Sequence, residues 1–264
     1  MGRVFEFTIE RIKVTNRKRN SALYKLGMVS GMALDLKFEK IEDFYQVYDR
    51  HRTYVNASVR KKHIRNFDEQ IWVPAEVKPY HSVLELGTGT GLFLAYLENK
   101  GIKDFKGIDS DPKVLEYMPQ SIADNVTIGD IWVALENTEN HFDRIVMLDV
   151  FEHFSYFEGR KLLSELRTHL TENGKIILRI PNAASPFGLQ YQYNDLTLKA
   201  VYGPGSIEHL AYAAGYRVDR RLSARRGNPV KKLMESFVFR VLDSVLTEPP
   251  PLWGANMIIV LSPL

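Results

Sequence analysis

Three glycines spaced by two residues are the feature of this chain with the clearest chemical meaning. Gly87, Gly89 and Gly91 stand between the apolar run 83–86 and the helix-forming run 92–97. Glycine suits such a turn because a Cβ is excluded where φ is positive or where a ligand approaches the backbone closely. The pattern predicts a strand, a tight turn and a helix that bind a nucleoside-sized ligand at the carboxyl end of the strand.

An acid follows at the end of the next predicted strand. Asp109 can accept hydrogen bonds from both hydroxyls of a ribose, because a carboxylate is an acceptor at both of its oxygens. Leu92 stands where a dinucleotide-binding turn would place its third glycine. The pattern therefore favours a different nucleoside cofactor, and a nicotinamide oxidoreductase is the least favoured class.

Residues 85–91 resemble the first motif of the class I S-adenosylmethionine-dependent methyltransferases. Residues 149–154 resemble the D-V-x-E-H-x signature of the ubiquinone-biosynthesis-like branch of that family. The resemblance implies S-adenosyl-L-methionine as the cofactor, and it assigns Asp130 to the adenine amino group. The residues expected at the cofactor are Glu85, Leu86, Gly87, Thr88, Gly89, Gly91, Asp109, Ser110, Asp130, Ile131, Trp132, Asp149 and Val150.

The candidate catalytic residues follow the fourth predicted strand, where the transferred methyl group should lie. Imidazole titrates near neutral pH and can act as a general base toward a hydroxyl, so His153 and its neighbour Glu152 are the candidates. The alternative is that both side chains only organise the loop. No metal-binding motif is legible, and no metal site is predicted.

The acceptor prediction rests on the residues after the fifth predicted strand. Residues 182–197 resemble a stretch of methyltransferases associated with bacterial surface-polysaccharide biosynthesis. That stretch continues with histidine in the resembled subgroup, whereas this chain has Leu198. The resemblance makes Asn182, Tyr191, Tyr193 and Asp195 the candidate acceptor-binding residues.

Together these patterns predict an S-adenosylmethionine-dependent methyltransferase that methylates an oxygen of a saccharide or sugar phosphate in surface-glycan biosynthesis. Two alternatives stay open. One is a methyltransferase of small molecules, of the quinone or natural-product type. The other is a noncatalytic cofactor-binding or scaffold subunit of a glycan assembly complex.

Alternating apolar strands and helices must position these residues. Predicted strands end near residues 86, 109, 130, 149 and 180, a turn is predicted at 172–174, and a last strand covers 255–261. Such alternation gives a mostly parallel sheet with helices on both faces and the ligand at its carboxyl edge. The predicted fold is α/β, a Rossmann-like class I methyltransferase fold with a mostly parallel seven-stranded sheet.

Two additions are predicted around this fold. Residues 1–75 form an N-terminal extension with a strand and helices, which either covers the cofactor and acceptor or adds a packing layer. Residues 76–264 form the methyltransferase domain, with a helical insertion at 225–250 before the last strand. Within it, 229–246 carries apolar residues at helical spacing and cations at its amino end, typical of a membrane-surface, core or homodimer helix.

Composition sets broad limits on location and partners. The 264 residues are 45% hydrophobic and 25% charged with a net charge of +3, which is ordinary for a globular chain and gives no nucleic-acid-binding signature. Cysteine is absent, which excludes disulfides and cysteine-ligated zinc. No signal peptide or membrane-spanning run is recognised, so the expected location is the cytoplasm, with the inner membrane face as the place of any contact through 229–246.

Overall fold

A computed structural model describes residues 38–47, 54–225 and 227–264 of the chain. These residues belong to one compact unit, Lys37–Leu264. The strand predicted within the first residues lies outside the described part of the chain. The domain boundary predicted after residue 75 stays a prediction.

The unit alternates strands with helices and short helical turns. Its strands are β1 (Val83–Leu86), β2 (Phe105–Asp109), β3 (Val126–Ile128), β4 (Phe142–Leu148), β5 (Leu170–Pro181), β6 (Tyr216–Ser223) and β7 (Asn256–Pro263). Its α-helices are α2 (Lys61–Phe67), α3 (Leu92–Asn99), α4 (Gln120–Ala123), α5 (Ile131–Glu136), α6 (Tyr156–Leu166), α7 (Leu189–Gln192), α8 (Pro204–Ala213) and α9 (Pro229–Val245). Short 3-10 or π turns are η1 (Ile41–Val47), η2 (Asp68–Trp72), η3 (Pro112–Tyr117), η4 (Phe151–His153) and η5 (Arg167–His169).

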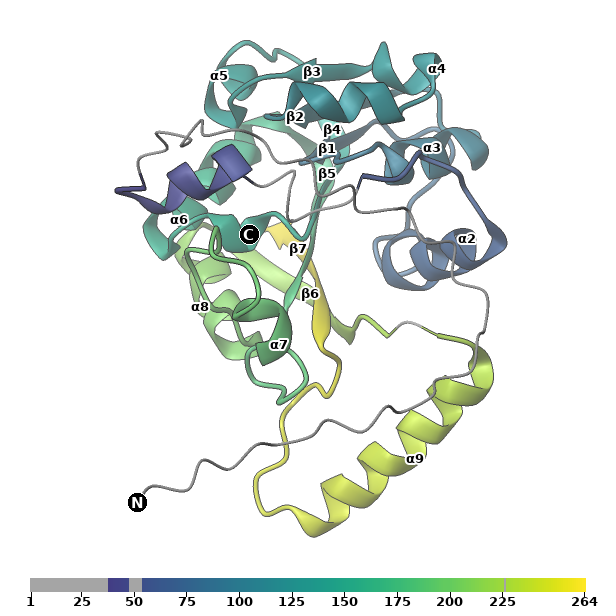
Figure 1. Ribbon diagram of the computed structural model, residues 1–264, viewed down its shortest axis with the longest axis vertical. Coiled ribbons are helices and arrows are strands. Elements are labelled where there is room, and N and C mark those ends of the chain that lie inside the picture. The colour runs from purple at the N-terminus through teal and green to yellow at the C-terminus, as the bar shows by residue number, and fades with distance from the viewer. Residues whose placement is uncertain (1–37, 48–53, 226) are drawn as a thin grey trace, which may run out of the picture. The chain divides into compact units, whose positions relative to one another are not determined.

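All seven strands lie in one sheet, in the order β3-β2-β1-β4-β5-β7-β6 (Figure 1). Strands β1 to β5 pair in parallel, and β7 runs antiparallel to both β5 and β6. The chain leaves β1 toward β2 on one side and later returns to β4 on the other, so the strand order reverses between β1 and β4. Ligands of open α/β sheets bind at such a reversal. The predicted mostly parallel seven-stranded sheet is confirmed.

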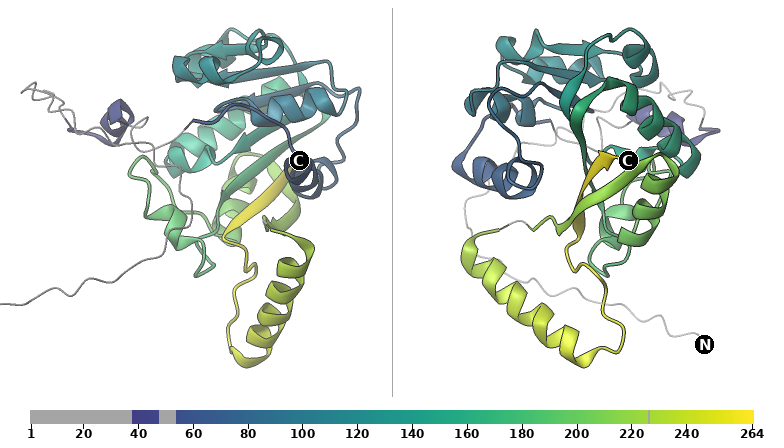
Figure 2. Two further views of the ribbon diagram at one scale, coloured as in Figure 1. Left: turned by 45° about the vertical axis from the view of Figure 1, so that its right-hand side comes forward. Right: turned by 180° about the vertical axis from the view of Figure 1, so that it is seen from behind.

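The sheet is covered on both faces because its central strands are apolar on both sides. In β4, Ile145 and Met147 pack into a core that contains residues of α6 and α8, whereas Val146 packs into a second core with residues of α3. This is the pattern of a buried parallel strand. Figure 1 and Figure 2 show α6 and α8 on one side of the sheet and α2 and α3 on the other.

The turn predicted at residues 172–174 is a bulge inside β5 instead. Leu170 pairs with Phe142, and Lys175 pairs with Arg144, so residues 171–174 of β5 face a single intervening residue of β4. The register therefore shifts between these two pairs, and extra residues on one strand that shift the register in this way form a bulge. The prediction was wrong because local turn residues do not reveal pairing on both sides of the turn.

The predicted helical insertion before the last strand is confirmed as α9. It follows β6 and precedes β7, and Figure 2 shows it beyond the end of these two strands. Asn228 caps its amino end by accepting a hydrogen bond from the Lys231 amide at 2.8 Å, and Pro229 occupies the first turn, where a missing N–H costs nothing. None of the residues of α9 is buried.

Candidate functional site

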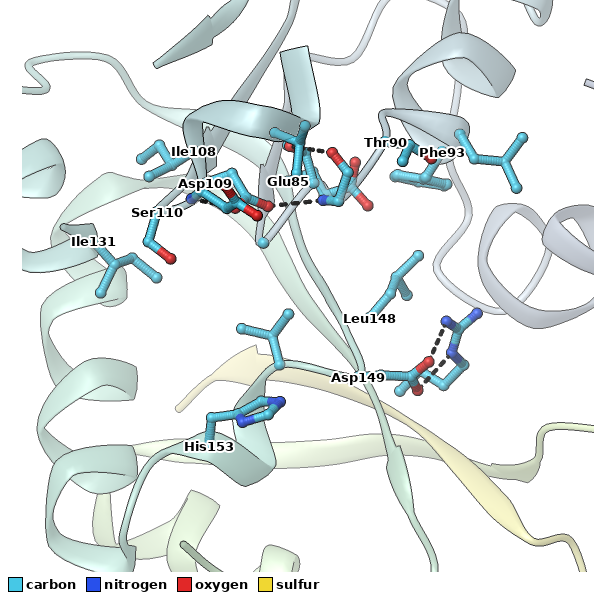
Figure 3. A pocket seen from close by; sticks show the side chains of 18 of the residues that line it. Glu85, Thr90, Phe93, Ile108, Asp109, Ser110, Ile131, Leu148, Asp149 and His153 are labelled. Carbon is cyan, nitrogen blue, oxygen red and sulfur yellow. Dashed lines mark hydrogen bonds and ion pairs between the residues drawn. The ribbon is translucent and has the colours of Figure 1, made fainter. Parts of the chain in front are cut away.

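A cavity of about 1340 Å³ lies at the carboxyl ends of β1, β2 and β4, where the strand order reverses (Figure 3). Pockets for one small ligand commonly measure about 300–1,000 Å³, so this cavity has room for two small molecules. Most of the predicted site residues line it: Glu85, Gly87, Thr88, Gly89, Asp109, Ser110, Asp130, Ile131, Trp132, Asp149, Val150 and His153. Leu86 lies in the core and Gly91 is the N-cap of α3, and neither is part of the lining.

The glycine turn after β1 forms the wall of the cavity. Gly87, Gly89 and Gly91 all have positive φ, at 74°, 50° and 75°. A Cβ on Gly87 would also lie 2.3 Å from Cγ2 of Val150, whereas a Cβ on Gly89 would meet no atom within 4 Å. The turn therefore requires glycine for its backbone, and at Gly89 it leaves open space beside the chain.

Asp109, at the end of β2, holds this turn in place. Its Oδ2 accepts a hydrogen bond from the Gly89 amide at 2.8 Å, and its Oδ1 accepts one from the Asp111 amide at 3.0 Å. Burial raises the pKa of Asp109, although these amide hydrogen bonds oppose the shift. Asp130 is placed differently, because its Oδ1 caps α5 by accepting from the Trp132 amide at 2.9 Å.

Charged side chains gather at the carboxyl ends of β1, β4 and β5. Arg179, from β5, donates to Asp149 through Nε at 2.9 Å and through Nη2 at 2.6 Å, a bidentate pair that Figure 3 marks with dashed lines at Asp149. Asp149 has a φ of 60°, which is uncommon for a residue with a side chain. Burial alone would lower the pKa of Arg179, but Asp149, Glu152 and Glu85 together raise it.

Glu85 is the buried acid of this group. Burial raises the pKa of its carboxyl well above the usual value; Arg179 opposes the shift and Asp109 adds to it. Its Oε2 has no hydrogen-bond partner among the described residues. A buried acceptor without a partner costs free energy, so Glu85 is a residue for which a ligand group would be favourable.

His153 lies on the opposite side of the cavity from Glu85 and Asp109 (Figure 3). Its Nδ1 is 2.8 Å from the Tyr45 hydroxyl, 3.1 Å from Oγ1 of Thr197 and 3.2 Å from the Thr197 carbonyl oxygen. Asp195 in turn accepts a hydrogen bond from the Thr197 hydroxyl at 2.5 Å. Two segments that are distant in sequence, η1 and residues 195–197, thus fix the orientation of the imidazole ring.

The other candidate catalytic and acceptor residues lie outside the cavity lining. Glu152 is buried, and its backbone oxygen accepts from the amides of residues 199 and 200. Asn182 is fully buried and donates to the carbonyl oxygens of residues 252 and 254. Tyr191 and Tyr193 are exposed on and beside α7. Only Asp195 reaches the site, and it does so through Thr197.

Residues before the sheet also contribute to the site. In η1, Glu42 pairs with Lys199 at 2.6 Å and Tyr45 contacts His153, so this turn is held against the cavity. Burial raises the pKa of Tyr45 to about 12, so its hydroxyl keeps its proton at neutral pH. Lys62 and Arg65 of α2 also line the cavity.

Some of these contributors carried no local signal. Arg179 sits in an apolar strand, and Lys199 follows the candidate acceptor stretch, so nothing in their neighbours marked them. Only the pairing of β5 beside β4 brings Arg179 to Asp149. Among the residues described, no three His, Asp or Glu side chains gather into a group that could hold a metal ion.

Comparisons with known proteins agree with this architecture. A family model described as a methyltransferase domain matches residues 48–220. No curated protein sequence matches the chain. A SAM-dependent methyltransferase from Archaeoglobus fulgidus is similar in structure, with a TM-score of 0.62 and 19% identity over 83% of this chain and 99% of that one.

Two further solved structures show the same fold at lower similarity. An S-adenosylmethionine-dependent methyltransferase from Clostridium acetobutylicum has a TM-score of 0.51 and 13% identity, over 84% of this chain and 98% of that one. The mitomycin 7-O-methyltransferase has a TM-score of 0.52 and 15% identity, over 76% of this chain and 55% of that one. At such identities the likeness concerns the fold.

The family match covers well over half of the chain and includes the glycine turn, the acids at the strand ends and His153. The predicted Rossmann-like class I fold and its cofactor are thereby confirmed. The chain belongs to the methyltransferase domain family, with S-adenosyl-L-methionine as its cofactor.

Proposed function

We propose that this protein transfers the methyl group of S-adenosyl-L-methionine to an oxygen of a saccharide or sugar phosphate in surface-glycan biosynthesis. The observation that carries the proposal is the cavity, which has cofactor-type acids on one side and, on the other, a histidine held by Tyr45 and Thr197. A methyl transfer needs these two halves to face one another across the acceptor. The proposed location is the cytoplasm.

The cavity wall fits the proposed cofactor. Gly89 leaves open space for a nucleoside against the backbone, and Asp109 and Asp130 offer carboxylate oxygens near it. Glu85 supplies an unpartnered buried acceptor for a cationic or amino group. We assign the ribose hydroxyls to Asp109 and the adenine to Asp130, Ile131 and Trp132, as the family resemblance implies.

Two observations support the proposed acceptor: a sequence resemblance and the basic residues that line the cavity. Residues 182–197 resemble the surface-polysaccharide subgroup, and Thr197 from this stretch contacts His153. Lys62 and Arg65 line the cavity and would favour a phosphate on the acceptor. Residues 149–154 support the ubiquinone-biosynthesis-like branch of the family by the same kind of resemblance.

Methyl transfer depends mainly on the alignment of the acceptor oxygen with the methyl group of the cofactor. The cofactor supplies an electrophilic methyl group whose leaving group is a neutral thioether. His153 accepts the proton of the acceptor hydroxyl as its oxygen becomes bonded to carbon, and Tyr45 and Thr197 keep the ring in position. Arg179 holds Asp149 in its left-handed conformation beside the cofactor half.

The first test is calorimetric titration with S-adenosyl-L-methionine and, as a control, with NAD. We expect micromolar binding of the first ligand only. Replacing Asp109 by alanine removes a charged hydrogen-bond acceptor and should weaken binding by about 1.5–3 kcal/mol. Equal affinity of the wild type and the variant would remove Asp109 from the cofactor site.

The second test concerns the proposed base. His153→Ala should lower turnover by about 10²–10⁴-fold, the range for a general base, while cofactor affinity is retained. Tyr80→Phe, a change at an exposed residue outside the cavity, is the control. Unchanged turnover of His153→Ala would leave the ring with a purely structural role.

The acceptor class is tested with a cofactor carrying a labelled methyl group. Label should enter the glycan or glycolipid fraction of a bacterial extract. Label in a quinone or other small-molecule fraction would support the alternative enzyme. Tight cofactor binding with no label in any fraction would support the noncatalytic subunit.

A further inference from the structure

Helix α9 presents its apolar face to the surroundings instead of to the sheet. Leu233, Phe237 and Val245 are 72%, 69% and 72% exposed. Further exposed apolar residues lie on the same side of the helix at spacings of three and four, and they are Val230, Met234, Val238 and Val241. Isolated exposed apolar residues need no explanation, but a continuous stripe along a helix marks an interaction surface.

The opposite face of α9 carries its polar residues together with Phe239, and it is tied to the rest of the unit. Arg225 donates to the Ser236 hydroxyl at 2.6 Å, and Lys232 pairs with Glu69 of η2. At the other end, Nε1 of Trp253 donates a hydrogen bond to Asp243 at 2.7 Å. The Trp253 ring stacks on the ring of Phe239, with their centroids 5.2 Å apart. These contacts hold the helix in the rotation that leaves the apolar face outward.

The charges around the outward face are of one sign. At 3.6 residues per turn, Lys231 and Arg240 fall at the two margins of the apolar stripe, and both are exposed. The two acids of the helix, Glu235 and Asp243, lie toward the anchored face, where they pair with Arg225 and Trp253. A second copy of this helix would therefore offer no acid on its own outward face to these two cations.

We propose that α9 docks on an anionic membrane surface, with its apolar face in the headgroup region and Lys231 and Arg240 at the phosphates. Helices with an apolar face and basic margins bind in this way, and long basic side chains extend to the interface. Within the described part of the chain no helix is long and apolar enough to cross a membrane, so the helix lies on the surface.

The docking would place the cavity at the membrane. Gly227 and Asn228, at the amino end of α9, line the cavity, and Arg65 of α2 donates to the Gly227 carbonyl oxygen at 3.2 Å. The acceptor would thus be delivered from the bilayer as a lipid-linked molecule. This consequence rests on the proposed methyl transfer, whereas the docking itself does not.

The test is co-sedimentation of the full chain with vesicles of phosphatidylcholine alone or mixed with phosphatidylglycerol. We expect binding to the anionic vesicles that weakens as salt is added. Phe237→Asp should lower the partition coefficient at least about tenfold. Lys231→Gln and Arg240→Gln should each lower it about fivefold, the factor that corresponds to about 1 kcal/mol per basic residue.

The matched control is Phe157→Asp, which changes an exposed phenylalanine of α6. It should bind vesicles as the wild type does. Absence of sedimentation by the wild type, or an equal loss in both phenylalanine variants, would overturn the proposal. So would a dimer in sedimentation equilibrium that Phe237→Asp dissociates without any vesicle binding, because the face would then belong to a second copy.

Calorimetry separates this proposal from the proposed function. The Phe237→Asp variant should bind S-adenosyl-L-methionine with the affinity of the wild type, since Phe237 does not line the cavity. Cofactor binding without vesicle binding would overturn the docking alone. Vesicle binding without cofactor binding would overturn the proposed function alone.

Discussion

Glu85 and Arg179 show how single residues prepare the cavity for a charged ligand. Arg179 already donates two hydrogen bonds to Asp149, and Oε2 of Glu85 has no hydrogen-bond partner in the described structure. The cavity therefore contains a buried acid that is poorly satisfied until a ligand arrives. Such a residue lowers the stability of the empty protein and favours binding.

This arrangement predicts that Glu85→Gln stabilises the cofactor-free protein. The pKa of Glu85 is raised in the folded protein. As the pH rises above the ordinary glutamate pKa of 4.5, this carboxyl therefore loses its proton in the unfolded chain before it does so in the folded one. The free energy of unfolding then falls with rising pH until the pH reaches the pKa of Glu85 in the folded state. Glutamine does not titrate, so thermal melts should show the variant gaining up to about 1–3 kcal/mol over the wild type as pH rises.

The same substitution should weaken cofactor binding, which calorimetry measures. Glu98→Gln, at an exposed glutamate of α3, is the control and should change neither quantity. A wild-type protein as stable as Glu85→Gln at every pH would contradict the assignment of Glu85 as an unsatisfied buried acid.

At the scale of elements, η1 acts as a cover, and two described contacts hold it against the site. The hydrogen bond between Tyr45 and His153 spans 108 positions of sequence, and Lys199 pairs with Glu42 of η1 as well as with Glu158 of α6. None of the residues of η1 is buried, so these few polar contacts must supply much of its docking free energy. An element held in this way opens more easily than the sheet.

We predict that Tyr45→Phe loosens η1. One hydrogen bond is worth about 1 kcal/mol, so hydrogen exchange of the amides in Ile41–Val47 should speed up about fivefold. Lys199→Met should have a smaller effect, about twofold, because partly exposed ion pairs contribute about 0.2–1 kcal/mol. Exchange in the sheet should stay unchanged in both variants, and the measurement is mass spectrometry of exchanged peptides.

The control is Lys103→Met, which removes an exposed lysine outside the cavity. If both site variants exchange like this control, η1 is held by contacts other than those to His153 and Lys199.

At the scale of the whole molecule, the sheet and α9 contribute to different properties. The two cores extend over both faces of the sheet and contain no residue of α9. The described contacts of the helix with the unit are a few hydrogen bonds and ion pairs, together with the rings of Phe187 and Trp253 against Phe239. The fold should therefore tolerate the loss of the helix.

We predict that replacing residues 229–245 by a flexible glycine-serine linker leaves a folded protein with the wild-type cofactor affinity. The aromatic stack and the hydrogen bonds lost are each worth about 1 kcal/mol, so the free energy of unfolding should fall by only a few kcal/mol. Thermal melts and calorimetry with S-adenosyl-L-methionine measure the two quantities. Loss of the folded state would show that α9 is part of the core architecture.

Much of the fold and of the cofactor half was legible in the sequence because the signals are local. The glycines of the turn and the acids at strand ends are set by residues a few positions away, through backbone conformation and strand polarity. The helical spacing of apolar residues in 229–246 likewise predicted α9. The turn at 172–174 was misjudged, because a bulge depends on what pairs with the strand.

Only the tertiary structure decided the rest, because it depends on residues distant in sequence. Packing brought Tyr45 and Thr197 to His153 and Arg179 to Asp149. It also buried Asn182 and left Tyr191 and Tyr193 outside the cavity lining. Periodicity gave α9 an apolar stripe, but only the contacts of Arg225 and Trp253 with its polar face turned that stripe outward.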